Sequence, residues 1–137
     1  YAMNESHAKE EAEFVINTLN DAGLSVGKLP MGVWFDMEDA DGYKANHCMP
    51  TGQELTNMCS VFINTLWNAG FINTGLYANY DWLTNILDVS QLGGCAIWCA
   101  QLNSRCDYDG ANLWQYTFSE NIEGREFDAD VVLNWPM

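Results

Sequence analysis

The sequence predicts an α/β fold built from β/α units. Two amphipathic helices alternate with short runs of almost entirely apolar, strand-forming residues. Such runs are typical of parallel strands covered on both faces, and the order strand, helix, strand is that of a β/α unit. The chain has 137 residues, 48% of them hydrophobic, and no repeat or linker divides it. Residues 1–137 are therefore expected to form a single domain with a substantial core.

The helices are expected where apolar side chains recur every three or four positions. The first covers residues 6–22, and Gly23 follows it as a stop signal. The second begins after Thr51, which has the spacing of a capping box with Glu54, and it ends at Gly70. A shorter helical turn is expected over residues 81–88.

Five apolar runs predict the strands. They cover residues 31–38, 75–79, 95–101, 112–117 and 127–133. The later runs lie too close together for full helices between them, so the second half of the chain is expected to close by loops.

The charge balance excludes several classes of partner. Five Lys and Arg stand against 19 Asp and Glu, giving a formal net charge of -14. Nucleic acids and anionic membrane surfaces are not expected partners, because both need a basic footprint. A neutral glycan suits a chain with 6 Trp, 6 Tyr and 6 Phe, although solubility alone also explains the acidity.

Targeting and metal-binding signals are absent from the sequence. No apolar run is long enough to span a bilayer and no signal peptide opens the chain, so the protein is either intracellular or has its export signal elsewhere. The 5 cysteines show no C-x-x-C pair and no Cys/His cluster at ligand spacing. We expect free structural thiols, no metal and no cofactor.

Carboxylates concentrate where the apolar run 31–38 ends, in the sequence Phe35-Asp36-Met37-Glu38-Asp39. Side chains two apart in a strand point to the same side, so Asp36 and Glu38 are expected to project together. Ligands of parallel β/α folds bind at the carboxyl ends of strands. The alternative is a solvated strand end without function.

Paired carboxylates suit the cleavage of a glycosidic bond. One acid stays protonated and gives its proton to the leaving oxygen, while the other stays ionised and stabilises positive charge. Mutual repulsion and an apolar surround separate the two pKa values. Acids two apart on one strand lie too close to act from opposite faces of a sugar. An N-acetylated sugar can instead supply its own acetamide oxygen as the nucleophile.

Short stretches along nearly the whole chain carry a family resemblance. They are Tyr1-Ala2, residues 8–12, Leu29-Pro30, residues 34–39, 69–71, 75–79, 97–101, 113–117 and 127–130. In this order they resemble the family 25 glycoside hydrolases, the muramidases called Chalaropsis-type lysozymes. The resemblance implies a TIM-like β/α barrel that cleaves the β-1,4 bond between N-acetylmuramic acid and N-acetylglucosamine in bacterial peptidoglycan.

The resemblance also implies roles for individual residues. Glu38 matches the general acid, and Asp36 matches the carboxylate that orients the acetamide. The positions that match the lining of the sugar groove are Tyr77, Trp98, Gln101, Trp114, Tyr116 and Asp128. Core packing is the alternative for each aromatic; the groove is favoured for Trp98 and Tyr116 and stays open for Trp114. Asp130 stands where the family's closing motif has Asn.

One departure concerns the start of the chain. Family members open with a strand that carries a D-x-S motif and pass through three β/α units before the Tyr-Ala motif. A full barrel needs at least about 200 residues. The sequence therefore predicts an incomplete barrel, the later portion only, with open edges at Tyr1 and near Phe127. A separate N-terminal fragment or a second copy of the chain is expected to complete it.

The resemblance predicts action outside the cytoplasm, on bacterial cell walls. The alternative function is a non-catalytic remnant that binds wall glycan and has lost turnover.

Overall fold

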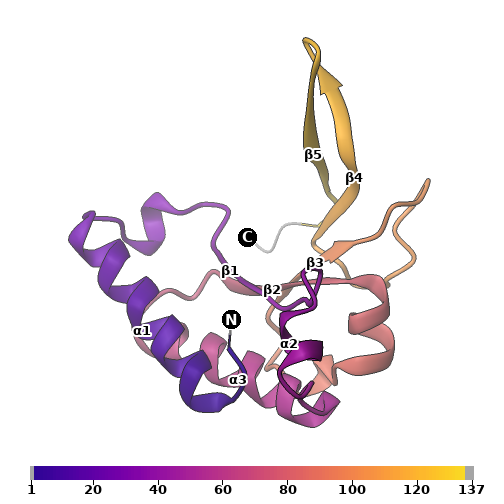
Figure 1. The fold of residues 1–137 in the computed structure, drawn as a ribbon. Coiled ribbons are helices and arrows are strands. Elements are labelled where there is room, and N and C mark those ends of the chain that lie inside the picture. Colours follow the sequence, from indigo (N-terminus) through magenta and orange to yellow (C-terminus); the bar gives the residue numbers. More distant parts are fainter. Residues whose placement is uncertain (1, 135–137) are drawn as a thin grey trace.

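A single curled sheet organises the computed structural model, which describes residues 2–134 (Figure 1). The strands are β1 (Val33–Asp36), β2 (Thr74–Asn79), β3 (Ala96–Ala100), β4 (Leu113–Ile122) and β5 (Arg125–Val132). They lie in the order β1-β2-β3-β4-β5; the first four pair in parallel, and β5 runs antiparallel to β4. The sheet is thus open, with β1 at one edge and β5 at the other.

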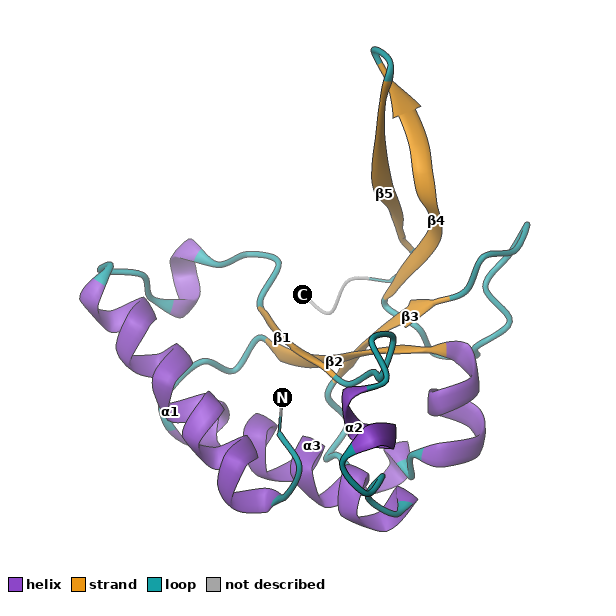
Figure 2. Ribbon diagram, in the orientation of Figure 1, coloured by secondary structure: helices purple, strands orange, loops and turns teal. Residues whose placement is uncertain are grey.

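The two long helices lie on one side of this sheet (Figure 2). They are α1 (Glu5–Asp21) and α3 (Gly52–Asn68), which pack on each other, and α3 also packs on β1 and β2. A short helix, α2 (Tyr43–Asn46), follows β1. A π-helical turn at Trp82–Ile86 and 3-10 turns at Val26–Lys28 and Val89–Gln91 complete the elements.

The helix ends confirm the predicted signals. Thr51 and Glu54 form both hydrogen bonds of a capping box at the start of α3. Gly23 and Gly70 follow the two long helices with φ of 66° and 95°, which a residue with a Cβ adopts only at a cost. Asn4 caps α1 by accepting a hydrogen bond from the backbone N–H of His7 at 2.9 Å.

The core lies between the sheet and α3. Phe35 of β1 stacks on Phe62 of α3, with ring centroids 4.2 Å apart and an interplanar angle of 14°. Around this pair lie fully buried side chains, among them Met37, Leu55, Met58, Ile63, Leu66 and Leu76. The apolar stripe predicted for the second helix is therefore core. No helix within residues 2–134 is long and apolar enough to cross a bilayer.

The end of the chain differs from the expected parallel, fully covered strands. The strands β4 and β5 form a long hairpin that projects away from α1 and α3 (Figure 1). Its far half is exposed, with 48% of Phe118, 56% of Ile122 and 47% of Phe127 open to solvent. The reversal is a tight turn at Glu123 and Gly124, both with positive φ, which is the geometry of a two-residue hairpin.

The predicted edges also need one correction. Tyr1 lies outside the described residues, and residues 2–4 form no strand. The open edge on that side of the sheet belongs to β1.

Gly75 provides a test of the packing on the side of the sheet that carries Trp34, opposite the helices. A Cβ at Gly75 would overlap the ring of Trp34 and lie 2.6 Å from the carbonyl oxygen of Ala96. We expect Gly75→Ala to lower the free energy of unfolding by about 1 to 3 kcal/mol, the usual cost of overpacking. Gly27→Ala is the control, because nothing lies within 4 Å of its Cβ position. Urea unfolding followed by tryptophan fluorescence measures both, and equal stability of the two variants would contradict the packing described.

Candidate active site

Strand β1 sets the direction of the two candidate acids. Phe35 and Met37 are buried, whereas Asp36 between them is exposed on the opposite side. The N–H of Met37 donates to the carbonyl oxygen of Tyr77 at 2.9 Å, so the pairing with β2 continues past Asp36. The charges of Asp36 and Glu38 both act on the hydroxyl of Tyr77. The two carboxyls therefore share one side of the sheet, as the alternation along a strand predicts.

Asp39, the third acid of the motif, has a structural role. The carboxylate of Asp39 accepts hydrogen bonds from the backbone N–H groups of Lys44 at 2.6 Å and Ala45 at 3.0 Å. Gly42, with φ of 70°, lets the chain turn back for these contacts. Asp39 therefore holds α2 against the end of β1.

Lys44 is a site residue that the sequence analysis missed. Only 5% of the residue is exposed, and its Nζ donates to the carbonyl oxygen of Glu38 at 3.0 Å. The sequence does hold a signal for it, because a basic residue is rare in this chain: Lys44 is one of 5 and follows closely after four acids.

The surroundings favour the protonated form of both acids. Loss of water around the carboxyl group is the main cause that raises the pKa of Asp36, although the residue as a whole is exposed, and the Lys44 charge opposes it. The pKa of Glu38 is also raised. Loss of water is the main cause, the charges of Asp36 and Asp41 add to it, and the Lys44 charge again opposes it. Glu38 thus has two negative neighbours that favour its protonated form, while Lys44 favours the ionised form of both acids.

A cleft of about 750 Å³ opens beside these acids, along the free edge of β1. One wall is α1, with His7, Glu10, Glu11, Phe14 and Val15. The other wall is formed by residues 34–38 with Ala40, Asp41, Lys44 and Phe62. Both candidate acids line it.

Aromatic rings continue the site across the concave face of the sheet. The register pairs Asp36 with Tyr77 and Tyr77 with Trp98, so these side chains point to one side. Trp98 meets Trp34 edge to face at 5.6 Å and Tyr77 edge to face at 5.0 Å between ring centroids. Trp34 was not among the site residues predicted from the sequence, although it stands two residues before Asp36.

A series of side-chain hydrogen bonds joins this face to the β4–β5 hairpin. The hydroxyl of Tyr77 donates to Gln115 Oε1 at 2.6 Å, and Gln115 Nε2 donates to Asp128 at 3.3 Å. Trp98 Nε1 donates to Asp130 at 2.8 Å. Burial and the surrounding carboxylates raise the pKa of Tyr77, which keeps its hydroxyl a donor. Gln115, also missed from sequence, is buried at the centre of this series.

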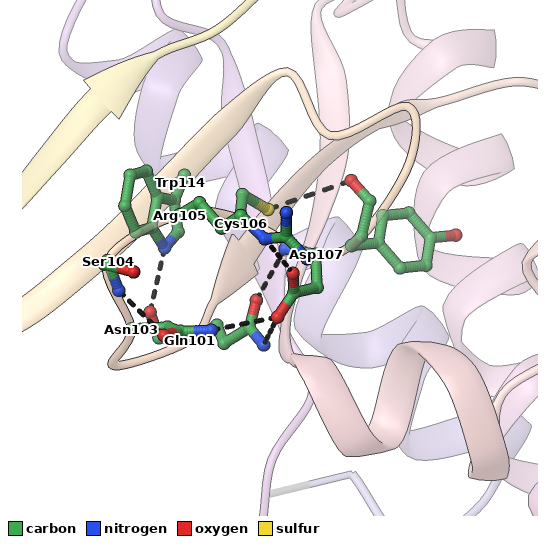
Figure 3. Close-up of polar contacts among 8 residues, drawn as sticks. Gln101, Asn103, Ser104, Arg105, Cys106, Asp107 and Trp114 are labelled. Carbon is green, nitrogen blue, oxygen red and sulfur yellow. Dashed lines mark hydrogen bonds and ion pairs between the residues drawn. The ribbon is translucent and has the colours of Figure 1, made fainter.

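The other three predicted groove residues do not lie on the concave face with Trp98. Register pairs Cys99 with Trp114, which places Trp114 on the face opposite Trp98, and Tyr116 lies next to it at 5.6 Å between rings. Gln101 is held in the β3–β4 loop by two hydrogen bonds with Asp107, of 2.8 and 2.9 Å (Figure 3). Its carbonyl oxygen accepts from Trp114 Nε1 at 2.8 Å. The structure thus brings together Tyr77, Trp98 and Asp128 with the acids, but not Gln101, Trp114 and Tyr116.

The described part of the chain contains no cluster of possible metal ligands. Residues 2–134 contain no group of three or more His, Cys, Asp or Glu placed to hold an ion. The cysteines are free thiols, as predicted. The chemistry that this arrangement supports is proton transfer by one of two neighbouring carboxyls whose pKa values are both raised.

The raised pKa values predict how stability depends on pH. The folded chain binds these protons more tightly than the unfolded chain, whose ordinary values are 3.8 for Asp36 and 4.5 for Glu38. Their contribution is fully present below those values and is lost as the pH rises through the folded pKa values. We expect Asp36→Asn to be more stable than the unmodified chain at pH 7 and equal to it below pH 3.8.

Glu54 offers a control of opposite sign. Hydrogen bonds from Thr51 lower the pKa of Glu54, so its carboxylate favours folding at neutral pH. Glu54→Gln should be less stable at pH 7, and the difference should vanish in acid. Urea unfolding across this pH range measures both variants. A destabilised Asp36→Asn at pH 7 would show that the Asp36 charge is compensated in the folded chain.

Comparison with known structures gives relatives of the same fold. The modular autolysin LytC from Streptococcus pneumoniae, in complex with a synthetic peptidoglycan ligand, matches with a TM-score of 0.78 and 20% identity, over 95% of this chain and 31% of that chain. The CTP1L endolysin matches with a TM-score of 0.70 and 20% identity, over 97% and 44%. A family 25 glycosyl hydrolase from Bacillus anthracis matches with a TM-score of 0.56 and 19% identity, over 72% and 47%.

This chain therefore spans less than half the length of each of these proteins. Comparison with curated proteins gave no match. The sequence pattern of the glycosyl hydrolases family 25 matches residues 1–125, nearly the whole chain. The chain belongs to glycosyl hydrolase family 25.

Proposed function

We propose that this chain is the later portion of a lysozyme-type peptidoglycan hydrolase, an N-acetylmuramidase. Its substrate would be the β-1,4 bond between N-acetylmuramic acid and N-acetylglucosamine. The observation that carries the proposal is the pair Asp36 and Glu38 at the carboxyl end of β1, both with a raised pKa, at the edge of an open cleft. Family membership and the peptidoglycan ligand of the LytC structure support the choice of substrate.

Glu38 is the proposed general acid. Its pKa is raised by loss of water and by the charges of Asp36 and Asp41, against the opposing charge of Lys44, and a raised pKa favours the protonated form that can donate to the leaving oxygen. Asp36 is the proposed carboxylate that orients the acetamide of the substrate, which supplies the nucleophilic oxygen. Lys44 favours the ionised form of Asp36 that this role requires.

The concave face is the proposed sugar-binding surface. The rings of Trp34, Tyr77 and Trp98 give it an apolar area, and Asp128 and Asp130 add hydrogen-bond acceptors at its far side. A site of this composition, largely aromatic with a few directed polar groups, suits a neutral polymer. Gln101 would contact glycan only if the glycan reached the β3–β4 loop, and Trp114 and Tyr116 only if it reached the opposite face of the sheet.

We propose a single catalytic domain whose barrel is incomplete in this chain and is closed by more protein. The free edges of β1 and β5 carry unpaired backbone groups, which folded proteins normally pair or cover. An N-terminal segment or a second copy of the chain would supply the missing strands. The proposed place of action is outside the cytoplasm, at the bacterial cell wall.

A second function is favoured by the same open edges. A chain with a half-buried aromatic face and unpaired strands would bind wall glycan without cleaving it. Purified cell walls separate the two functions: loss of turbidity with new reducing ends supports the hydrolase, while sedimentation with walls and no new ends supports the binding function.

The role of Glu38 is tested by Glu38→Gln, which keeps the shape and removes the proton. In a preparation that cleaves walls, we expect the rate to fall by about 100- to 10,000-fold, the usual contribution of general acid catalysis, with little change in glycan affinity. Release of reducing ends from purified walls measures the rate. Asp21→Asn, at the exposed end of α1, is the matched control and should leave the rate unchanged. Normal cleavage by Glu38→Gln would refute the assignment.

A further inference from the structure

Lys44 is a buried cation beside the candidate acids. Only 5% of it is exposed, and it lines the same cleft as Asp36 and Glu38. The close ion pairs within residues 2–134 lie on the surface, between Lys9 and Glu13 and between Arg105 and Asp107. Burying an ammonium group without one close counter-ion costs free energy unless several groups compensate it. The position of Lys44 therefore calls for an explanation beyond packing.

Two contacts fix Lys44 to the segment that carries Glu38. Its Nζ donates to the carbonyl oxygen of Glu38 at 3.0 Å, and its backbone N–H donates to Asp39 Oδ1 at 2.6 Å. Together these two contacts join the end of the loop, at Lys44, to its start, at Glu38 and Asp39. The backbone that presents the Glu38 carboxyl is thus held by the side chain and the main chain of one residue.

The charge of Lys44 acts on both acids. It lowers the pKa of Asp36 and that of Glu38, against the loss of water that raises them. The other ionisable groups around the cleft are Asp39 and Asp41 in the loop, His7, Glu10 and Glu11 on α1, and Cys59 on α3, on which Lys44 also acts. Lys44 is the buried positive charge among them.

We propose that Lys44 is a positioning residue of the acid pair, which holds the backbone of Glu38 in place and supplies a buried positive charge beside both carboxyls. Glu38 differs from Asp36 because Asp36 and Asp41 add negative charge beside it. Lys44 thus favours the ionised form of both acids, and the difference between them comes from the negative charges that act on Glu38. The meaning of this charge for catalysis rests on the proposed function, whereas its effect on the two acids is measurable without substrate.

The test separates charge from hydrogen bonding at one position. Lys44→Gln removes the charge and retains a donor for the Glu38 carbonyl, whereas Lys44→Arg retains the charge. Carboxyl carbon NMR shifts give the titration midpoints of Asp36 and Glu38 in the whole chain. We expect both midpoints to move to higher pH in Lys44→Gln and to stay near those of the unmodified chain in Lys44→Arg. In a cleaving preparation, the activity profile of Lys44→Gln should move in the same direction.

Lys28→Met is the matched control. The Nζ of Lys28 also donates to a backbone carbonyl, that of Gly23 at 2.8 Å, but on an exposed loop. This variant should leave both midpoints unchanged. Unchanged midpoints in Lys44→Gln, or equal shifts in Lys28→Met, would overturn the proposal. Shifted midpoints in a chain that cleaves no wall would support it while counting against the proposed function.

A measurement on the unmodified chain covers the case in which Lys44→Gln does not fold. The side-chain nitrogen resonance of Lys44 should show an inflection when Asp36 titrates, and that of Lys28 should show none. The absence of an inflection at Lys44 would overturn the proposal without any variant.

Discussion

The site depends on the alternation of side chains along one short strand, β1. Phe35 and Met37 enter the core, where Phe35 stacks on Phe62 at 4.2 Å between ring centroids, and this leaves Asp36 and Glu38 on the concave side. A shift of register by one residue would expose both apolar side chains, at about 1.5 to 3 kcal/mol each, and would bury both carboxyls. The packing of two apolar residues thus determines where two acids lie.

The same strand end explains why neighbouring carboxyls have different tasks. Asp39 follows Glu38 directly, but its oxygens accept the N–H groups of Lys44 and Ala45 and hold α2 in place. That contact places the Lys44 ammonium against the Glu38 carbonyl. A structural carboxylate therefore positions the cation, and the cation acts on the two acids whose carboxyls face the cleft.

The local signals in the sequence predicted most of the fold, and the failures came from features that require register. Capping at Thr51, the glycine stops, the stripe on α3 and the side taken by Asp36 and Glu38 all follow from spacing within one element. Tyr116 was expected in the groove and Trp114 was left open between groove and core, because motifs alone do not show which face a side chain takes; the pairing of Cys99 with Trp114 places them on the face opposite Trp98. The hairpin was missed because Glu123-Gly124 was not recognised as a turn, and Lys44 because its burial depends on the reversal at Gly42.

Covering the concave face would change the two acids unequally. Loss of water is the largest cause of the raised pKa of each, so any covering, by glycan or by more protein, would raise both further. A lower local dielectric also strengthens the charge interactions. For Asp36 the strengthened interaction is with Lys44 and opposes the rise, whereas Glu38 also has Asp36 and Asp41, which add to it. We therefore expect a cover to raise the pKa of Glu38 more than that of Asp36.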